Sequence, residues 1–254
     1  KLLSQLSKKK VIYDFRQNDL FEGGDGAPLS PIFHQLIVKK KKINLPVCFL
    51  NIGGISNFTF IRDFIDENLI SKDIGPGNCL IDEWIRRNKK GNYDKYGELA
   101  SAGKTNELTL NQALEDFENI PVKNINSFDV NDFEINFLRG LNLEDGASTI
   151  TDFTAYIIAS KLLDEIIKSN QKISKIILCG GGRKNLTLIK RIENYSGNKI
   201  KFEDIENYGV DGDFVESQAF AFLAIRSFLK LPISFPNTTG CKLPSTGGVL
   251  VKNF

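Results

Sequence analysis

The chain has 254 residues and a mass of 28.5 kDa, enough to bury a sizeable core as one large domain or two ordinary lobes. Its 33 Lys and Arg residues nearly balance 31 Asp and Glu residues, which argues against a nucleic-acid-binding protein or a polybasic membrane anchor. A hydrophobic content of 41% suits a soluble globular protein, and no apolar run approaches the roughly 20 residues of a membrane helix. We therefore expect small-molecule partners rather than nucleic acid or a membrane.

The cysteines and the single histidine exclude several kinds of site. Cys48, Cys79, Cys179 and Cys241 form no CxxC pair, so neither a zinc-ligand pattern nor a disulfide framework is indicated, and a reduced, intracellular chain is expected. His34 lies in an apolar stretch and is the only histidine, so a catalytic triad would have to use it. We expect a structural role for His34 and no protein-only metal site.

The first recognisable elements are two strands joined by a glycine turn. The apolar runs at 47–52 and 57–61 flank Gly53 and Gly54, and glycine supplies the unusual backbone dihedrals of a tight connection. This pattern predicts a hairpin.

A third strand is expected to lead into a helix through a second glycine turn. An extended stretch at 69–74 ends at the Gly-Pro-Gly sequence of 75–77, and apolar residues then recur at helical spacing. Asn78 is placed to cap that helix. Asp73 is therefore expected where a strand meets a glycine loop and a helix start.

Helices dominate the rest of the chain. Two or three helices are predicted over 106–139 and a long amphipathic helix over 148–168, followed by a buried strand at 175–179 that ends in three glycines. The later elements are a helix at 185–195, a strand at 200–202 and a helix at 215–229. Antiparallel strands followed by strand–helix alternation predict a mixed α/β fold with helices packed on a sheet.

Three glycine loops follow predicted strands, at 51–57, 73–78 and 179–185. Glycine lets backbone N–H groups approach a ligand, and a helix start just beyond adds a positive dipole end that suits anions. None of the loops matches a P-loop or a GxGxxG fingerprint, and each alone is more often a simple turn. Three such loops in one chain favour a nucleotide site.

Several acidic residues are candidates for catalysis, and Asp73 is the best placed because it precedes a glycine loop at a strand end. Asp82 lies inside a predicted helix, where a carboxylate is usually solvated or capping. Glu216 lies in the first turn of a helix, where the dipole stabilises a negative charge anyway. Arg16 beside Asp14 could form an ion pair or clamp a substrate.

The motifs DFRQNDLFEGGDGAPLSPIFHQ, LNIGGISN, DIGPGNCLIDEW, LCGGGRKN, VESQAFAFLA and TGCKLPSTGGVL together resemble those of the anhydro-N-acetylmuramic acid kinases, over essentially the whole chain. The resemblance implies a mixed-sheet, ribonuclease H-like lobe of the actin-like ATPase kind at 47–254, with 1–46 as the remainder of an N-terminal lobe and a substrate-cleft segment. It implies ATP and Mg²⁺ as cofactors, a cytoplasmic location, and an association that could be a homodimer.

The implied reaction is the opening of the anhydro ring of 1,6-anhydro-N-acetylmuramic acid by water, coupled to phosphorylation of its 6-oxygen by ATP. By the same resemblance, Asp73 is the catalytic base and Glu216 a second active-site carboxylate. The residues implied to bind ligands are Gly53 and Gly54 for phosphate, Gly180, Gly181, Gly182 and Asn185 for adenosine, and Asp14, Arg16, Asp19 and Asn57 for the sugar.

The chain departs from the family pattern in two places. The family begins with a further segment that carries a glycine-rich GTSxDGxD loop for the phosphates; without it, we expect an incomplete chain that could be inactive alone. The family commonly has Gln where Asp25 stands. The alternatives are a related sugar kinase of other specificity, a non-catalytic sugar-binding fragment and, distantly, a nucleic-acid module supported only by lysines 8–10 and 39–42.

Overall fold

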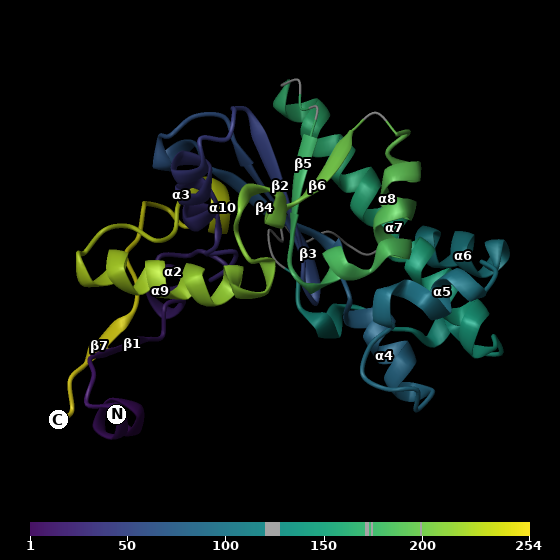
Figure 1. Ribbon diagram of the computed structural model, residues 1–254, viewed down its shortest axis with the longest axis horizontal. Coiled ribbons are helices and arrows are strands. Elements are labelled where there is room, and N and C mark those ends of the chain that lie inside the picture. The colour runs from purple at the N-terminus through teal and green to yellow at the C-terminus, as the bar shows by residue number, and fades with distance from the viewer. Residues whose placement is uncertain (120–127, 171–172, 174, 199) are drawn as a thin grey trace. The chain divides into compact units, whose positions relative to one another are not determined.

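The computed structural model describes residues 1–119, 128–170, 173, 175–198 and 200–254 (Figure 1). The chain forms two compact units. Unit 1 comprises residues 1–46, 59–72 and 214–254, and unit 2 comprises residues 47–58 and 73–213. The division into 1–46 and 47–254 expected from the sequence stays a prediction.

Unit 2 is built around a five-stranded sheet of order β4-β3-β2-β5-β6, in which β3 and β4 continue into unit 1. The strands are β2 (Val47–Ile52), β3 (Ile55–Ile61), β4 (Ile70–Pro76), β5 (Lys175–Cys179) and β6 (Lys201–Asp204). The helices of this unit are α4 (Cys79–Arg87), α5 (Glu98–Ala102), α6 (Glu107–Glu118), α7 (Leu143–Ser169) and α8 (Leu186–Tyr195), with short 3-10 turns between them.

The sheet is mixed, as predicted. β2 pairs in parallel with β5, from Cys48 opposite Ile176 to Asn51 opposite Cys179, and β5 pairs in parallel with β6. Only two residues connect β2 to its neighbour β3, a length that joins antiparallel strands. The apolar runs of β2 and β5 are almost wholly buried, because helices cover a parallel pair on both faces.

Asparagine starts three of the helices of unit 2. The side chains of Asn106, Asn142 and Asn185 accept hydrogen bonds from backbone N–H groups in the first turns of α6, α7 and α8. Each bond satisfies a donor that the helix itself leaves unpaired, and is worth about 1 kcal/mol. Local sequence therefore determines where these helices begin.

Helix α7 is the longest element and packs against α4, α5, α6 and α8. Its residue Gly146 lets the Trp84 ring of α4 approach the α7 backbone, and Trp84 Nε1 donates to the Leu143 carbonyl oxygen at 2.9 Å. Over 106–139, where two or three helices were predicted, the described residues form α6 and two 3-10 turns, at Val130–Asp132 and Asn136–Leu138. Part of that prediction, residues 120–127, falls outside the described residues.

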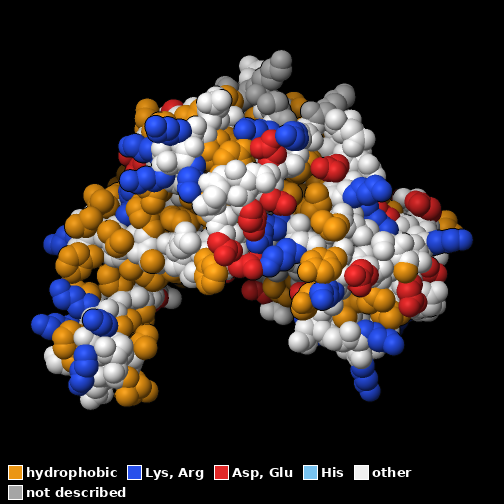
Figure 2. All heavy atoms as spheres, in the orientation of Figure 1, with side chains coloured by type: hydrophobic (Ala, Val, Ile, Leu, Met, Phe, Trp, Pro, Cys, Tyr) orange, Lys and Arg blue, Asp and Glu red, His pale blue; other side chains and the backbone are white. Residues whose placement is uncertain are grey.

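Unit 1 contains a two-stranded antiparallel sheet and several helices. Its elements are α1 (Leu2–Ser7), β1 (Val11–Tyr13), α2 (Gln17–Phe21), α3 (Pro31–Lys41), α9 (Val215–Phe228), α10 (Pro236–Thr239) and β7 (Val249–Val251), with β1 paired to β7. Many large apolar side chains of this unit are exposed, among them Phe21, Ile225 and Phe228. Figure 2 shows apolar side chains gathered over α9.

His34 lies in the core of unit 1, in line with the structural role expected for it. Its Nδ1 is 2.9 Å from Thr59 Oγ1, and the side chain is almost completely buried. Burial lowers the pKa of His34 to about 3, because the charged imidazolium would lose its hydration. The four cysteines are free and buried.

Candidate active site

Three glycine turns of unit 2 meet at one asparagine. The Asn78 backbone N–H donates to the Gly53 carbonyl oxygen at 2.8 Å, and Asn78 Nδ2 reaches the same oxygen at 3.1 Å. The Gly77 N–H donates to the Gly54 carbonyl oxygen at 2.9 Å, and a Cβ on Gly182 would lie 3.1 Å from Asn78 Nδ2. We name the three turns the hairpin corner (53–54), the bend corner (75–77) and the β5 corner (180–182).

The prediction that the side chain of Asn78 caps α4 is wrong. Asn78 occupies the N-cap position, but its side chain makes no capping hydrogen bond. Its amide group instead donates to the carbonyl oxygens of Ile52 and Gly53. The side chain therefore joins the bend corner to the hairpin corner.

The glycines of the corners fall into two groups. A Cβ on Gly77 or Gly182 would overlap neighbouring atoms, and Gly180 has a φ of +79° with a Cβ position 2.6 Å from the Ile52 carbonyl oxygen. Gly54 and Gly181 are exposed instead, and the atoms nearest to a Cβ there are 3.8 and 4.0 Å away. The positions in the first group need glycine because a side chain would collide with neighbouring atoms. Those in the second group expose backbone that a ligand can approach.

Asp73 lies inside β4 rather than at its end, because the strand continues to Pro76. The carboxylate is half-buried, and its Oδ2 accepts a hydrogen bond from the Phe128 backbone N–H at 2.9 Å. Two residues further on, Val130 Cγ2 is the nearest atom to the Cβ position of Gly54. The segment that begins at Phe128 thus lies against both Asp73 and the hairpin corner.

Asn57, on β3, carries a buried acceptor with nothing to accept. Its Oδ1 has no hydrogen-bond partner within the described part of the chain. Such an atom costs about 1–3 kcal/mol of desolvation unless a donor reaches it. A ligand hydroxyl or amide would supply that donor.

Asn185 follows the β5 corner and caps α8. Its Oδ1 accepts from the Leu188 N–H at 3.0 Å, and the residue is buried. This contact gives Asn185 a structural task, and its role toward adenosine stays a prediction.

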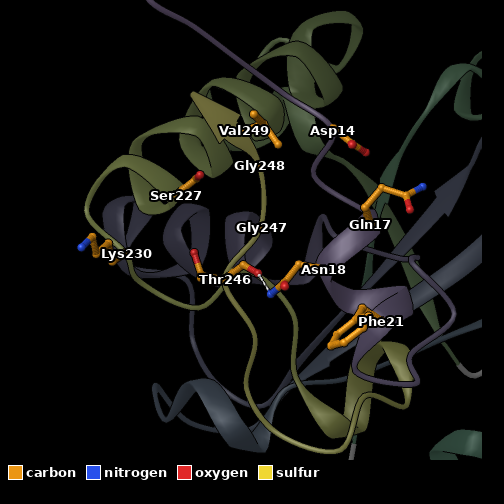
Figure 3. Close-up of a pocket in the computed structure, with 10 residues that line it drawn as sticks. All are labelled: Asp14, Gln17, Asn18, Phe21, Ser227, Lys230, Thr246, Gly247, Gly248 and Val249. Atoms are coloured by element: carbon orange, nitrogen blue, oxygen red, sulfur yellow. Dashed lines mark hydrogen bonds between the residues drawn. The ribbon is translucent and has the colours of Figure 1, made fainter. Parts of the chain in front are cut away.

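In unit 1, Asp14 lines an open pocket of about 660 Å³ between α2, the end of α9 and the loop leading to β7 (Figure 3). Asp14 has a φ of +61°, an uncommon conformation for a residue other than glycine. Asn18 holds the pocket wall in place, since its Nδ2 donates to the Thr246 carbonyl oxygen at 2.5 Å. Lys230 and the exposed Phe21 ring complete a lining that offers donors, acceptors and an apolar surface.

The other predicted sugar-binding residues of unit 1 do not line this pocket. Asp19 is buried, and its carboxylate accepts from the Gly26 N–H at 2.8 Å and from Thr239 Oγ1 at 2.6 Å. These bonds organise the loop that follows α2. Arg16 is exposed at the start of α2, and Glu216 is exposed in the first turn of α9.

The structure thus places eight of the predicted site residues in unit 2 and joins the glycine corners through Asn78, while the roles of these residues remain predictions. They are Asp73, Asn57, Gly53, Gly54, Gly180, Gly181, Gly182 and Asn185. The remaining candidates, Asp14, Arg16, Asp19 and Glu216, belong to unit 1.

Sequence reasoning missed three features of the site. Asn78 was assigned to a cap, Phe128 acts through its backbone, and Arg183 forms an ion-pair cluster with two distant carboxylates. A backbone donor leaves no signal in a single sequence. The motif LCGGGRKN does place Arg183 beside the glycines, but its partners lie 23 and 30 residues away.

The described residues hold neither a ready-made metal cage nor a membrane-spanning helix. Within ranges 1–119, 128–170 and 175–198, and in the remainder of the described chain, no three His, Cys, Asp or Glu side chains converge to hold a metal ion. The helices of those residues include none with the length and apolar character to cross a bilayer.

Comparison with known proteins identifies the family. The sequence model of the anhydro-N-acetylmuramic acid kinases matches residues 1–253. A curated relative of that name from Pelagibacter ubique is 54% identical, with 100% of this chain and 68% of the relative covered. Another from Zymomonas mobilis is 39% identical, with 97% of this chain and 65% of the relative covered. The chain belongs to the anhydro-N-acetylmuramic acid kinase family, and it spans about two thirds of the length of these relatives.

Among solved structures, similarity is weak. The activator of 2-hydroxyisocaproyl-CoA dehydratase from Clostridium difficile with bound ADPNP is 13% identical, with a TM-score of 0.44 over 78% of this chain and 67% of that chain. Component A of (R)-2-hydroxyglutaryl-CoA dehydratase from Acidaminococcus fermentans gives the same TM-score over 75% and 69%. At this level neither structure bears on the chemistry of the present chain.

Proposed function

We propose that the chain is the larger part of an ATP-dependent kinase that converts 1,6-anhydro-N-acetylmuramic acid to N-acetylmuramic acid 6-phosphate, with hydrolytic opening of the anhydro ring. Family membership supports this reaction. The single observation that carries the proposal is the placement of Asp73 in the unit that gathers three glycine corners around Asn78. A carboxylate and exposed backbone N–H groups are what the two halves of this reaction require.

Asp73 acts as the general base for the attacking water. The bond between the anomeric carbon and the 6-oxygen breaks while a bond from that carbon to the water oxygen forms. A proton passes from the water to Asp73, and the carboxylate also stabilises the positive charge that develops on the anomeric carbon. The Phe128 N–H orients the carboxylate for this task.

The departing 6-oxygen takes the γ-phosphoryl group of ATP, and the bond between that group and ADP breaks. No acid has to protonate the 6-oxygen, because it gains a phosphoryl group. Gly54 of the hairpin corner and Gly181 of the β5 corner expose backbone to the ligand side, which suits phosphate and adenosine respectively. The remaining corner glycines keep the turns close enough to act together.

Sugar-binding residues are proposed in unit 2 from an unpaired buried atom and in unit 1 from the family likeness. Asn57 offers its unpaired Oδ1 to a sugar hydroxyl or to the N-acetyl N–H. On the family likeness, Asp14 and Arg16 are assigned to sugar binding, and Glu216 is assigned as a second active-site carboxylate. Asp19 is proposed to act through the loop it organises, because its carboxylate is already bonded to Gly26 and Thr239.

Mg²⁺ is proposed to enter with ATP. Kinases hold this ion chiefly through substrate phosphates and one or two carboxylates, so a three-residue protein cage is not required. When bound, the ion would neutralise charge on the phosphates, and no step is assigned to it here. We also propose that the enzyme acts in the cytoplasm, where ATP is available, and that two copies associate as a homodimer.

The test is the reaction itself. The chain, and the chain extended to the length of its relatives, are incubated with ATP and 1,6-anhydro-N-acetylmuramic acid, and the products are resolved by mass spectrometry. N-acetylmuramic acid 6-phosphate is the expected product. Phosphorylation of an ordinary hexose without ring opening would favour a sugar kinase of other specificity, and sugar binding without turnover in the longer form would favour a non-catalytic role.

A further inference from the structure

Arg183 is a buried cation immediately after the β5 corner. Only 4% of its side chain is exposed, in contrast to most arginines on a protein surface. It belongs to a cluster with Lys184, Glu206 and Asp213, which come from three successive 3-10 turns of unit 2. Figure 2 shows acidic and basic side chains side by side near the middle of the face shown.

A buried arginine beside a glycine turn could be taken for a phosphate ligand, but its donors are already used. Nε donates to Glu206 at 3.0 Å, and Nη2 donates to Glu206 at 2.5 Å and to Asp213 at 2.9 Å. Nη1 donates to the Gly180 carbonyl oxygen at 2.9 Å. Four of the five guanidinium N–H groups are therefore spent inside the protein.

Charge in the cluster is balanced. Burial is the largest single influence on the pKa of Glu206 and would raise it, but the hydrogen bond from Arg183, backbone hydrogen bonds and the charge of Arg183 together lower that pKa. The pKa of Asp213 is lowered as well, by hydrogen bonds from Lys184 and Arg183. The positive charges of Arg183 and Lys184 are thus balanced by the carboxylates of the cluster, so the cluster has no excess positive charge that would attract a phosphate.

The surrounding backbone fits only this arrangement. A Cβ on Gly212 would lie 2.5 Å from the guanidinium carbon of Arg183, so glycine is needed there for the guanidinium to reach its partners. The Gly212 N–H also donates to Glu206 at 3.3 Å. The carboxylates hold the guanidinium, and the guanidinium holds the carbonyl group of Gly180.

We propose that Arg183 is a positioning residue, which holds the β5 corner in the conformation that receives the adenosine part of a nucleotide. The inference rests on the proposed function, because it takes the β5 corner as the adenosine subsite. Arg183 touches the corner through one carbonyl group and touches no ligand. Lysine cannot replace it, because the three N–H groups of an ammonium share one nitrogen, whereas the donors of Arg183 are spread over three nitrogens.

The test is nucleotide titration of the whole chain, labelled with ¹⁵N-glycine, with adenosine and ADP as separate probes. NMR shift changes detect millimolar affinities, so weak binding is measurable. Arg183→Lys should weaken the binding of adenosine and of ADP by the same factor, about tenfold, which corresponds to about 1.4 kcal/mol. If Arg183 instead contacted the phosphates, the substitution would weaken the binding of ADP alone.

Arg191→Gln is the matched control. Arg191 is a partly exposed arginine of unit 2 that forms an ion pair with Asp152 at 3.0 Å and donates to backbone oxygens of Ser148 and Ala100. Its loss should lower thermal stability but leave both affinities within about twofold. Should Arg183→Lys fail to fold, Glu206→Gln keeps the arginine and weakens one acceptor, with the same equal weakening of both probes expected at smaller size.

The outcomes separate the two proposals. If the unaltered chain and Arg183→Lys bind both probes with equal affinity, the positioning role is overturned. The same holds if only the affinity for ADP falls. In both cases the proposed nucleotide site stands. An unaltered chain that binds neither probe overturns the adenosine subsite, and the positioning role with it.

Discussion

The backbone N–H of Phe128 donates a hydrogen bond to Oδ2 of Asp73 at 2.9 Å. Aromatic packing holds this donor in place: the Phe128 ring centroid lies 5.5 Å from that of Phe133, and Phe133 stacks on Phe117 of α6 at 6.2 Å. A hydrogen bond to a carboxylate favours its ionised form and fixes its direction. The described residues from Phe128 onward therefore fix the direction of the Asp73 carboxylate.

Removing this donor should impair turnover without removing a side chain from the site. Phe128→Pro deletes the N–H, and we expect the turnover number in the full-length form to fall about tenfold, the value of one charge-assisted hydrogen bond. Phe128→Leu keeps the N–H and should stay within about threefold of the unaltered enzyme. Equal turnover of the two variants, measured by coupled ADP release, would show that the bond does not orient Asp73.

Asp73→Asn should abolish most of the reaction. An amide cannot accept the proton of the attacking water, and general base catalysis is worth roughly 10²–10⁴ in rate. ADP affinity should change little, because the substitution leaves the backbone of the three corners, where we propose that the nucleotide binds, unchanged. Asp82→Asn is the control, because it removes a different carboxylate, and the turnover of this variant should match that of the unaltered enzyme. A comparable loss of turnover in Asp82→Asn would show that the effect is not specific to Asp73.

Asp82→Asn should also stabilise the folded chain at neutral pH. Burial raises the pKa of Asp82 to about 6, with Arg86 opposing and Asp94 adding to the rise. Because this folded-state pKa exceeds the ordinary value of 3.8 for an aspartate, ionisation of Asp82 costs stability as pH rises from about 4 to about 6. The expected gain above pH 6 is about 1 kcal/mol after solvent screening.

Urea unfolding of both forms at pH 7 and pH 4 measures the difference. The gain should be present at pH 7 and absent at pH 4. A difference that does not change with pH would mean that the two side chains differ in packing and not in charge.

His34 should make the folded state sensitive to acid. Burial lowers its pKa to about 3, below the ordinary histidine value of 6.5, so the unfolded chain binds an extra proton between these pH values. The contribution of neutral His34 to the free energy of unfolding is fully present above pH 6.5. It decreases as pH falls, by about 3 kcal/mol at pH 4.

His34→Asn removes the titrating group and should flatten the dependence of unfolding free energy on pH between 6.5 and 4, while lowering stability at pH 7 because the contact with Thr59 changes. Parallel curves for the two forms would mean that His34 does not titrate in this range.

Much of the fold could be predicted because local patterns and tertiary structure agree. The apolar runs that became β2 and β5 are short and rich in β-branched residues, and both are buried strands. The structure of the chain around Asp73 was harder to predict. β4 runs through Pro76, whose carbonyl oxygen accepts a hydrogen bond from Ser56 Oγ of β3 at 3.2 Å, and no local pattern reveals this partner.

The candidate site was predictable where residue type alone suffices, and not where contacts decide. Glycines after strands pointed to the three corners, yet only the structure separates Gly54 and Gly181 from the glycines that packing requires. Asn78 was given the wrong partner because an asparagine before a helix usually caps it, whereas here two carbonyl oxygens of the hairpin corner compete successfully for its amide. Arg183 and its carboxylates are brought together by tertiary structure alone.

The most direct test of the account is a single turnover of 1,6-anhydro-N-acetylmuramic acid and ATP in ¹⁸O-labelled water, by the chain at the length of its relatives, quenched before the sugar exchanges oxygen. We predict one solvent oxygen on the anomeric carbon of the 6-phosphorylated product and none in its phosphate, with this product lost in Asp73→Asn. Solvent oxygen in the phosphate, or full labelling of the anomeric carbon by Asp73→Asn at the unaltered rate, would contradict it.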